Sequence, residues 1–160
     1  MKVINKKFST IQELDQKLNL ESFQKETTLI QIFSGFVLES EVKQIQSIIK
    51  KKNPYLSFIG TTTAGEIYEG ESFENTISIS IITFEKTMIK ENYFFDEDDF
   101  ILGRKMAKEL FTSKTKAMIL FVSGLETNGN DLIDGVSSVD SSVTLAGGLA
   151  GDNGHIVSTY

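Results

Sequence analysis

The amino-acid sequence predicts an α/β fold: a mixed β-sheet with an antiparallel hairpin and helices packed on it. Two observations predict this class. Helical patterns alternate along the chain with short apolar runs rich in β-branched residues, such as 28–33, and strands separated by helices favour parallel pairing. By contrast, residues 76–84 are followed by a second strand-like stretch with no helix between them, which favours an antiparallel pair.

Helical and strand patterns follow one another along the first half of the chain. Thr10 and Glu13 have the spacing of a capping box, in which two side chains satisfy the free amides at a helix start, so a helix begins here. A second helix over 39–52 ends in three lysines, just before Pro54 forbids further extension. The strands expected in this half are 28–33, 55–61 and, as a short strand or turn, 67–70.

The second half begins with residues 76–84, where isoleucine alternates with threonine and serine at the period of a strand. We expect residues 87–95 to pair with this strand as a hairpin through Glu85 and Lys86, although neither residue favours a tight turn. Helices are expected over 100–111 and 130–139, and strands over 116–123, 143–146 and 156–159. The inward positions of all these elements predict a core of Ile30, Ile32, Ile45, Ile49, Phe58, Ile79, Ile81, Ile119, Phe121, Leu132 and Val136.

Composition excludes several classes of function. The chain has 160 residues, 40% apolar and 24% charged, which suits one globular domain. It has no cysteine, so a disulfide scaffold, a thiolate metal site and a cysteine nucleophile are excluded. The net charge of −6 argues against nucleic acid as a partner, because phosphates repel an acidic surface. No apolar run has the length of a membrane span or of a signal peptide core, so we expect a cytoplasmic protein without a membrane partner.

Three glycine-rich loops follow or join expected strands, at residues 60–67, 123–131 and 147–154. Each combines glycines with hydroxyl, amide or carboxylate side chains. Loops beyond strand ends are where open α/β sheets bind small ligands, and if the strands are parallel the first two loops emerge at the same sheet edge. The same residue types also form turns for local reasons, so architecture remains the alternative for each loop.

The three loops resemble the signatures of the FIST sensory domain, in its N-terminal part. Residues 62–67, Thr-Thr-Ala-Gly-Glu-Ile, are similar to its S-T-A-G-E-I signature, and residues 147–152, Gly-Gly-Leu-Ala-Gly-Asp, are similar to its G-G-x-A-G-D signature. Between them, residues 124–129 resemble its G-L-x-x-N-G segment. The order and spacing agree from about Leu29 onward. The chain departs from the family in having Thr61 where a cysteine or small residue is common, and in stopping at Tyr160, where the family domain continues.

The resemblance implies a single N-terminal FIST sensor domain over residues 1–160, truncated at its C-terminal end, from an intracellular bacterial signalling protein. Such domains lie beside output domains such as cyclases, kinases or chemotaxis receptors, and amino acids are the ligands proposed for them. We therefore expect a sensor that binds a small molecule, with an amino acid as the suggested ligand, and that acts on an output domain or protein. The expected ligand-binding residues are Thr62, Thr63, Gly65, Glu66, Asn128, Gly147, Gly148 and Asp152.

Other interpretations remain open. One branch of the family is described as haem-binding nitric-oxide sensors, for which the single histidine, His155, is the candidate iron ligand. A hydrolase-like enzyme would use Asp152 or Glu66 as a general base. A pure interaction domain would use the loops only as architecture. We expect no cofactor and no catalytic residue.

Two further expectations concern metals and assembly. The acidic run at residues 96–99 lacks the pattern of a calcium loop, so we interpret it as a helix start and expect no metal site. A truncated domain would leave the strand near Ile156 at an unpaired sheet edge. Because such edges pair with other chains, we expect a homo-oligomer.

Overall fold

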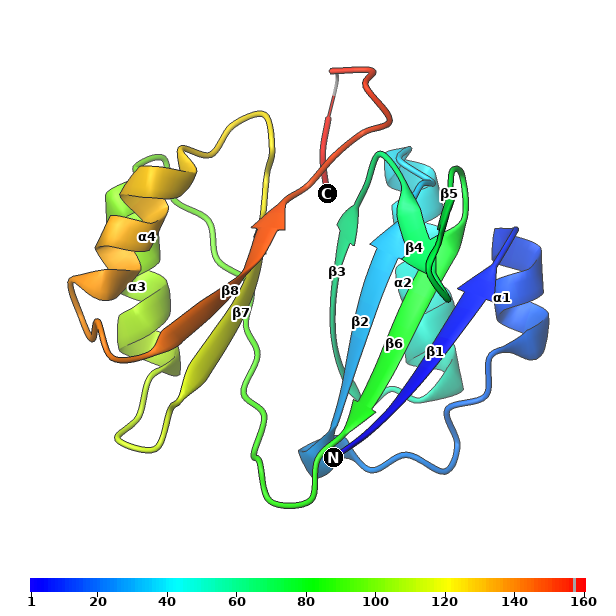
Figure 1. The fold of residues 1–160 in the computed structure, drawn as a ribbon, viewed down its shortest axis with the longest axis horizontal. Helices are drawn as coiled ribbons and strands as arrows, with labels where there is room; N and C mark the ends of the chain where they lie inside the picture. The colour runs from blue at the N-terminus through cyan, green and yellow to red at the C-terminus, as the bar shows by residue number, and fades with distance from the viewer. Residues whose placement is uncertain (157) are drawn as a thin grey trace. The chain divides into compact units, whose positions relative to one another are not determined.

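The computed structural model describes residues 1–156 and 158–160, which fall into two compact units (Figure 1). The first unit contains Met1–Ile89 and Ala150–Tyr160, and the second contains Lys90–Leu149. The first unit has the elements β1 (Lys2–Phe8), α1 (Ile11–Lys17), β2 (Thr28–Ser34), α2 (Glu39–Lys52), β3 (Ser57–Thr62), β4 (Glu66–Tyr68), β5 (Glu71–Phe73) and β6 (Ile77–Thr83). The second unit has the elements α3 (Asp99–Leu110), β7 (Ala117–Val122), α4 (Gly129–Ser137) and β8 (Thr144–Leu149).

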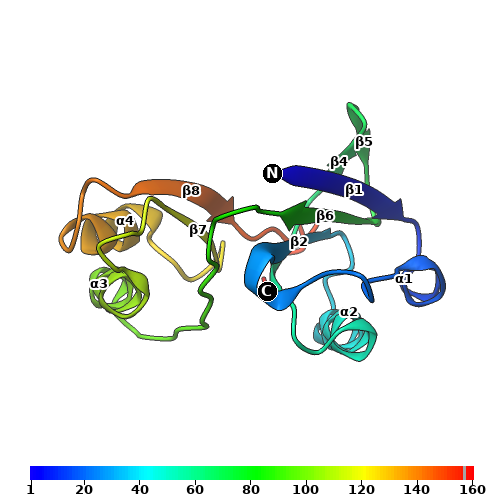
Figure 2. The ribbon, with the colours of Figure 1, turned by 90° about the horizontal axis from the view of Figure 1, so that it is seen from below.

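A four-stranded sheet with the order β1-β6-β2-β3 forms the centre of the first unit. β2 and β3 run parallel, whereas β6 runs antiparallel to both β1 and β2, so the predicted mixed sheet is confirmed. Figure 2 shows α1 and α2 on one side of this sheet. The alternate residues Ile77, Ile79 and Ile81 of β6 lie in the core at no more than 1% exposure, because a strand turns every second side chain to the same face.

β1 is a strand that the sequence analysis does not predict, because three lysines interrupt its alternation. Its Ile4 and Phe8 nevertheless lie opposite Ile81 and Ile77 of β6, so apolar side chains meet across the pair. The predicted hairpin partner of β6 is wrong: residues 87–95 form no strand, and β1 lies beside β6 instead. The physical reason is the absence of turn-forming residues between 84 and 87. In addition, the N-terminal strand places apolar side chains opposite the apolar residues of β6.

The tight hairpin of the first unit is formed by β4 and β5. Its turn residues Glu69 and Gly70 have φ angles of 51° and 84°, and two successive left-handed residues are what a type I′ hairpin turn requires. The expected short strand or turn over 67–70 is therefore confirmed. The Ser78 hydroxyl of β6 donates to the Ile67 carbonyl at 3.4 Å, which ties the hairpin to the sheet.

Side-chain caps begin the helices α1 and α3 where the sequence predicts. Thr10 Oγ1 accepts a hydrogen bond from the Glu13 amide at 3.0 Å, and the Glu13 carboxylate accepts one from the Ser9 amide at 2.8 Å. The pKa of the Glu13 carboxyl is lowered mainly by the hydrogen bond from the Lys17 side chain and, to a smaller extent, by the hydrogen bond from the Ser9 amide. Asp98 accepts from the Ile101 amide at 2.8 Å at the start of α3, so the acidic run does serve as a helix start.

In the second unit, α3 and α4 pack together on one side of the parallel β7–β8 pair (Figure 2). Two glycines allow the helices to meet backbone to backbone. A Cβ added to Gly103 would lie 2.1 Å from the carbonyl oxygen of Leu132, and one added to Gly135 would lie 2.2 Å from that of Phe100. The buried residues of this small core are Ala107, Met118, Val136 and Val143.

The predicted core differs from the observed one chiefly in β7. Ile119 is 38% exposed and Phe121 is only partly buried, contrary to the prediction, and Phe58 of β3 is also only partly buried. β7 belongs to a two-stranded sheet with helices on one face. Because Met118 and Leu120 pack against the helical core, the alternate residues Ile119 and Phe121 face away from it.

Two expectations about strands need correction. β3 and β7 lie in separate sheets, so the loops that follow them do not leave one common sheet edge. Of the strand expected over 156–159, Val157 lies outside the described residues, and Ile156 has a left-handed φ of 54° rather than an extended backbone. Among the described residues, no helix combines the length and the apolar character needed to cross a membrane.

Alanine in place of Gly135 should destabilise the protein. A glycine-to-alanine change inside a helix ordinarily stabilises it by about 0.5–1 kcal/mol, but here the methyl group would collide with the Phe100 backbone. We expect the free energy of unfolding in urea to fall by roughly 1–3 kcal/mol, as in an overpacked core. Gly129→Ala is the matched control in the same helix, because its added Cβ has no neighbour closer than 3.9 Å. Equal stability of the two variants would contradict the close helix contact.

Candidate ligand-binding loops

The parallel strands β2 and β3 end side by side in the first unit, and the polar loops begin there. Ser34, the last residue of β2, pairs with Thr62, the last residue of β3. Beyond this point the Thr63 amide donates to the Ser34 carbonyl at 2.9 Å, so the two chain ends stay together as they leave the sheet. Carboxyl ends of parallel strands are the usual ligand-binding edge of α/β sheets.

Glu66 closes the loop after β3 with a buried carboxylate that is only 1% exposed. Its Oε1 accepts a hydrogen bond of 2.5 Å from the Thr63 hydroxyl. Its Oε2 accepts from the Thr76 amide at 3.0 Å and from the Thr76 hydroxyl at 2.7 Å. Three donors from two segments therefore replace the water that this carboxylate gives up, and they fix the loop to the start of β6.

Gly35 allows the loop after β2 to approach the same place. A Cβ at this position would lie 2.7 Å from the Asn75 nitrogen and 3.0 Å from Glu66 Oε1. The Gly35 amide donates to the Thr76 carbonyl at 2.9 Å. A side chain at this position would thus push the buried carboxylate and the turn before β6 apart.

The C-terminal segment of the first unit joins these loops through Gly151 and Asn153. The Gly151 amide donates to the Thr62 carbonyl at 2.8 Å. Asn153 Nδ2 donates to the Gly35 carbonyl at 2.8 Å and to Asn75 Oδ1 at 3.2 Å. Both asparagines have left-handed φ angles, 56° and 55°, which asparagine tolerates better than most residues.

Asp152 lies between these two contact residues and is 5% exposed. Since Gly151 touches the loop after β3 and Asn153 touches the loop after β2, the Asp152 backbone is held within one residue of both. Thr62, which is 1% exposed, makes a second hydrogen bond with the C-terminal segment: its hydroxyl accepts from the Tyr160 amide at 3.0 Å. The first unit thus brings together Thr62, Thr63, Gly65, Glu66 and Asp152.

The other three predicted residues, Asn128, Gly147 and Gly148, belong to the second unit, where two of them have visible structural roles. Asn128 Oδ1 accepts from the Asn130 amide at 3.1 Å and so caps α4. Gly147 of β8 lies opposite Leu120 of the parallel strand β7, at a close approach of the two backbones. A Cβ on Gly147 would be 1.8 Å from the Leu120 carbonyl oxygen. Gly148 has open space around its Cβ position.

Sequence reasoning missed Gly35, Asn75, Thr76 and Asn153 as members of the loop cluster. Thr76 and Asn75 precede an obvious strand, and nothing in their sequence context links them to Glu66, ten residues earlier. Gly35 had a usable signal, since it is the first glycine of the chain and directly follows a buried strand. Asn153 had a weaker one in the Asn-Gly pair with Gly154.

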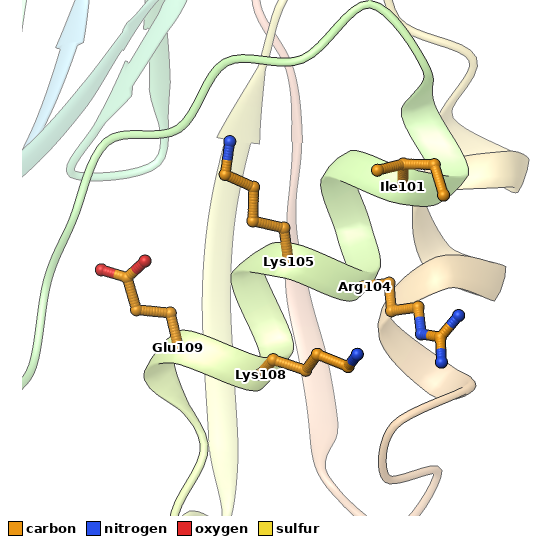
Figure 3. Close-up of a pocket in the computed structure, with 5 residues that line it drawn as sticks. All are labelled: Ile101, Arg104, Lys105, Lys108 and Glu109. Atoms are coloured by element: carbon orange, nitrogen blue, oxygen red, sulfur yellow. The ribbon is translucent and has the colours of Figure 1, made fainter.

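Within the described residues, neither a metal-binding cluster nor the hollow described below involves these loops. Within the described part of the chain, no group of three or more histidine, cysteine or acidic side chains has a metal-binding arrangement. His155 is exposed. A shallow hollow on α3 is lined by Ile101, Arg104, Lys105, Lys108 and Glu109, none of which is a predicted ligand-binding residue (Figure 3).

The described elements define an α/β domain with glycine- and threonine-rich loops at strand ends, the edge at which open α/β sheets bind their ligands. The family model described as FIST N domain matches residues 28–160, and the chain therefore belongs to this family, which is a sensor family of signal transduction. The matched region begins at β2, so β1 and α1 precede it even though β1 completes the sheet beside β6. No curated protein and no solved structure matched the chain.

Removal of the Glu66 side chain should destabilise the fold strongly. Glu66→Ala leaves the Thr76 amide and two hydroxyls without their acceptor in a buried place, and each such group costs about 1–3 kcal/mol. We expect the free energy of unfolding to fall by at least about 3 kcal/mol in urea titrations. Glu74→Ala, at an exposed position in the same region, should change it by no more than about 0.5 kcal/mol. A Glu66→Ala variant as stable as this control would show that the three hydrogen bonds are not formed in solution.

Proposed function

We propose that this chain is an intracellular sensor domain that binds a small polar molecule, such as an amino acid, in the loops around Thr63, Glu66 and Asp152. The observation that carries the proposal is the meeting of four segments, those after β2 and β3, the turn before β6 and the C-terminal segment, which include the buried acidic residues Glu66 and Asp152 at 1% and 5% exposure. Burial of a carboxylate carries a desolvation cost, and recognition of a charged or polar ligand is a function that makes use of such groups.

The chemistry of the loops suits a ligand that carries both an ammonium and a carboxylate group. A carboxylate offers about four acceptor positions, and Glu66 receives three hydrogen bonds, two of them on Oε2. One acceptor position on Oε1 therefore remains, and we propose that a ligand ammonium takes it, with Asp152 as a second acidic residue of the site. Main-chain amides of the exposed residues Ala64 and Gly65 are suited to a ligand carboxylate.

Thr63 links ligand binding to the fold in this proposal. It is only partly buried, and its hydroxyl already donates to Glu66. A ligand that contacts Thr63 would therefore act directly on the Glu66 hydrogen bonds, and Thr62 next to it would carry the change to the C-terminal segment. Asn128, Gly147 and Gly148 remain predicted binding residues, and Gly65 is proposed to let a ligand approach the backbone.

The wider role follows from the sensor family. We propose that residues 1–160 are one FIST N-type sensor domain of a cytoplasmic bacterial protein, and that ligand binding acts on an output domain or protein. The absence of cysteine agrees with a reducing compartment. A ligand-free state stabilised by internal hydrogen bonds and a ligand-bound state with different ones would provide the two states that signalling needs.

A thermal-shift screen of the purified chain against the twenty standard amino acids tests the proposal. At a ligand concentration 100 times its Kd, binding to the folded state stabilises it by about 2.7 kcal/mol, so the melting temperature should rise for at least one of them. Thr63→Val and Asp152→Ala should each abolish this rise. Chromatography of the incubated ligand should show no product, since turnover would instead favour a hydrolase that uses Asp152 or Glu66.

Thr87→Val serves as the control, because Thr87 is exposed and lies away from the loops in the first unit. It should retain the full ligand-induced rise. The proposal is contradicted if no amino acid raises the melting temperature of a folded wild-type protein, or if the rise persists in both Thr63→Val and Asp152→Ala.

A further inference from the structure

The exposed side of α3 is basic in a protein whose net charge is −6. Arg104, Lys105 and Lys108 all line the hollow on this helix together with Ile101, which is 46% exposed. Figure 3 shows the Arg104 and Lys108 side chains extending to the same side of the helix, away from Lys105 and Glu109. The hollow therefore combines an apolar residue with two neighbouring positive charges.

Only one of these cations is neutralised within the described part of the chain. Lys105 lies 3.7 Å from the Asp96 carboxylate and also donates to the Phe95 carbonyl at 3.3 Å. Neither Arg104 nor Lys108 has an acidic group within ion-pair distance among the described residues. Two exposed cations with no ion-pair partner among the described residues remain available to a second molecule.

The adjoining helix α4 has the opposite charge. Between Gly129 and Ser137 its charged residues are Asp131 and Asp134, with no basic residue. Both aspartates are exposed, and because they are three residues apart they occupy neighbouring positions on one face of the helix. α4 therefore presents two like charges on one face, which here are negative.

These two surfaces are held next to each other by the helix contact in the second unit. The Cβ position of Gly135 is 3.1 Å from the Arg104 nitrogen, and that of Gly103 is 3.0 Å from the Val136 nitrogen. The backbone contact fixes α3 and α4 as one rigid pair, so its positive and negative halves keep a constant spacing. We call this surface the helix pair, defined by Ile101, Arg104 and Lys108 on α3 and by Asp131 and Asp134 on α4.

We propose that the helix pair is a dimer interface that binds the helix pair of a second copy of this chain around a two-fold axis. A two-fold rotation places α3 of each copy against α4 of the other, so the same cation–carboxylate contact forms twice. Ile101 of each copy then supplies apolar contact beside the charged residues, and the charges set the orientation of the two copies.

The charge pattern favours a second copy over an unrelated acidic protein. An acidic partner would satisfy Arg104 and Lys108 but would repel Asp131 and Asp134, which are fixed beside them. A second copy satisfies all four charges at once. The net charge of −6 on each chain opposes association, so dimerisation should depend on these local contacts and weaken as salt screens them.

Light scattering coupled to size-exclusion chromatography, over a series of protein and salt concentrations, tests the interface. The wild-type chain should form dimers at high concentration and dissociate as salt rises. Arg104→Glu combined with Lys108→Glu should raise the dimer Kd at least about tenfold, because like charges then face each other. Asp131→Lys combined with Asp134→Lys should do the same. Mixing these two variants should give a dimer stronger than either variant forms alone. One of its two contacts then pairs the substituted residues of both variants and the other pairs their unsubstituted residues, so both contacts are attractive.

The variant with all four substitutions provides the decisive comparison, because it reverses both halves and should dimerise again within about threefold of the wild type. Lys50→Glu combined with Lys51→Glu on α2 matches the change in net charge elsewhere on the chain, and should leave the dimer Kd unchanged. A wild-type chain that is monomeric at all concentrations overturns the proposal. A dimer that the double variants do not weaken, or that the four-residue variant does not restore, also overturns it, because association then uses another surface.

Discussion

The buried carboxylate of Glu66 is the contact on which the loop cluster of the first unit depends. It is 1% exposed and is held by Thr63 on one oxygen and Thr76 on the other. A carboxylate removed from water without such donors would cost several kcal/mol. The loop before Glu66 and the start of β6 must therefore both stay in place, and the interaction that stabilises the fold also fixes the geometry of the proposed site.

Small residues extend this constraint to the other segments. Gly35 lets the chain after β2 reach Glu66 and Asn75, and Gly151 approaches the loop after β3, where a Cβ would lie 3.0 Å from the Ala64 nitrogen. Asn153 then joins the C-terminal segment to both regions. In the second unit Gly103 and Gly135 likewise allow the backbones of α3 and α4 to approach closely. In both units, glycine at specific points determines which backbones can touch.

Local patterns in the sequence predicted most of the elements but not all of their partners. The alternation in β6 and the caps of α1 and α3 are local signals, and the structure confirms them. Strand pairing is non-local. β1 has weak alternation, and its residue Asn5 is 75 residues away from its pairing partner Ser80 in β6. The prediction that the adjacent residues 87–95 pair with β6 was therefore wrong. For the site, the motif residues were visible in sequence, whereas Thr76 was not, because only folding brings its hydroxyl to Glu66.

Residue-specific amide hydrogen exchange, followed by NMR, tests the central role of Glu66 most directly. The Thr76 amide donates to the buried carboxylate at 3.0 Å, so its exchange should be nearly as slow as that of Ile79 in the centre of β6. Exposed Thr87, outside any helix or strand, gives the rate expected without protection. The account predicts that the Thr76 amide resembles Ile79 in the wild type and becomes fast in Glu66→Ala relative to Ile79. A Thr76 amide that already exchanges as fast as Thr87 in the wild type would contradict it.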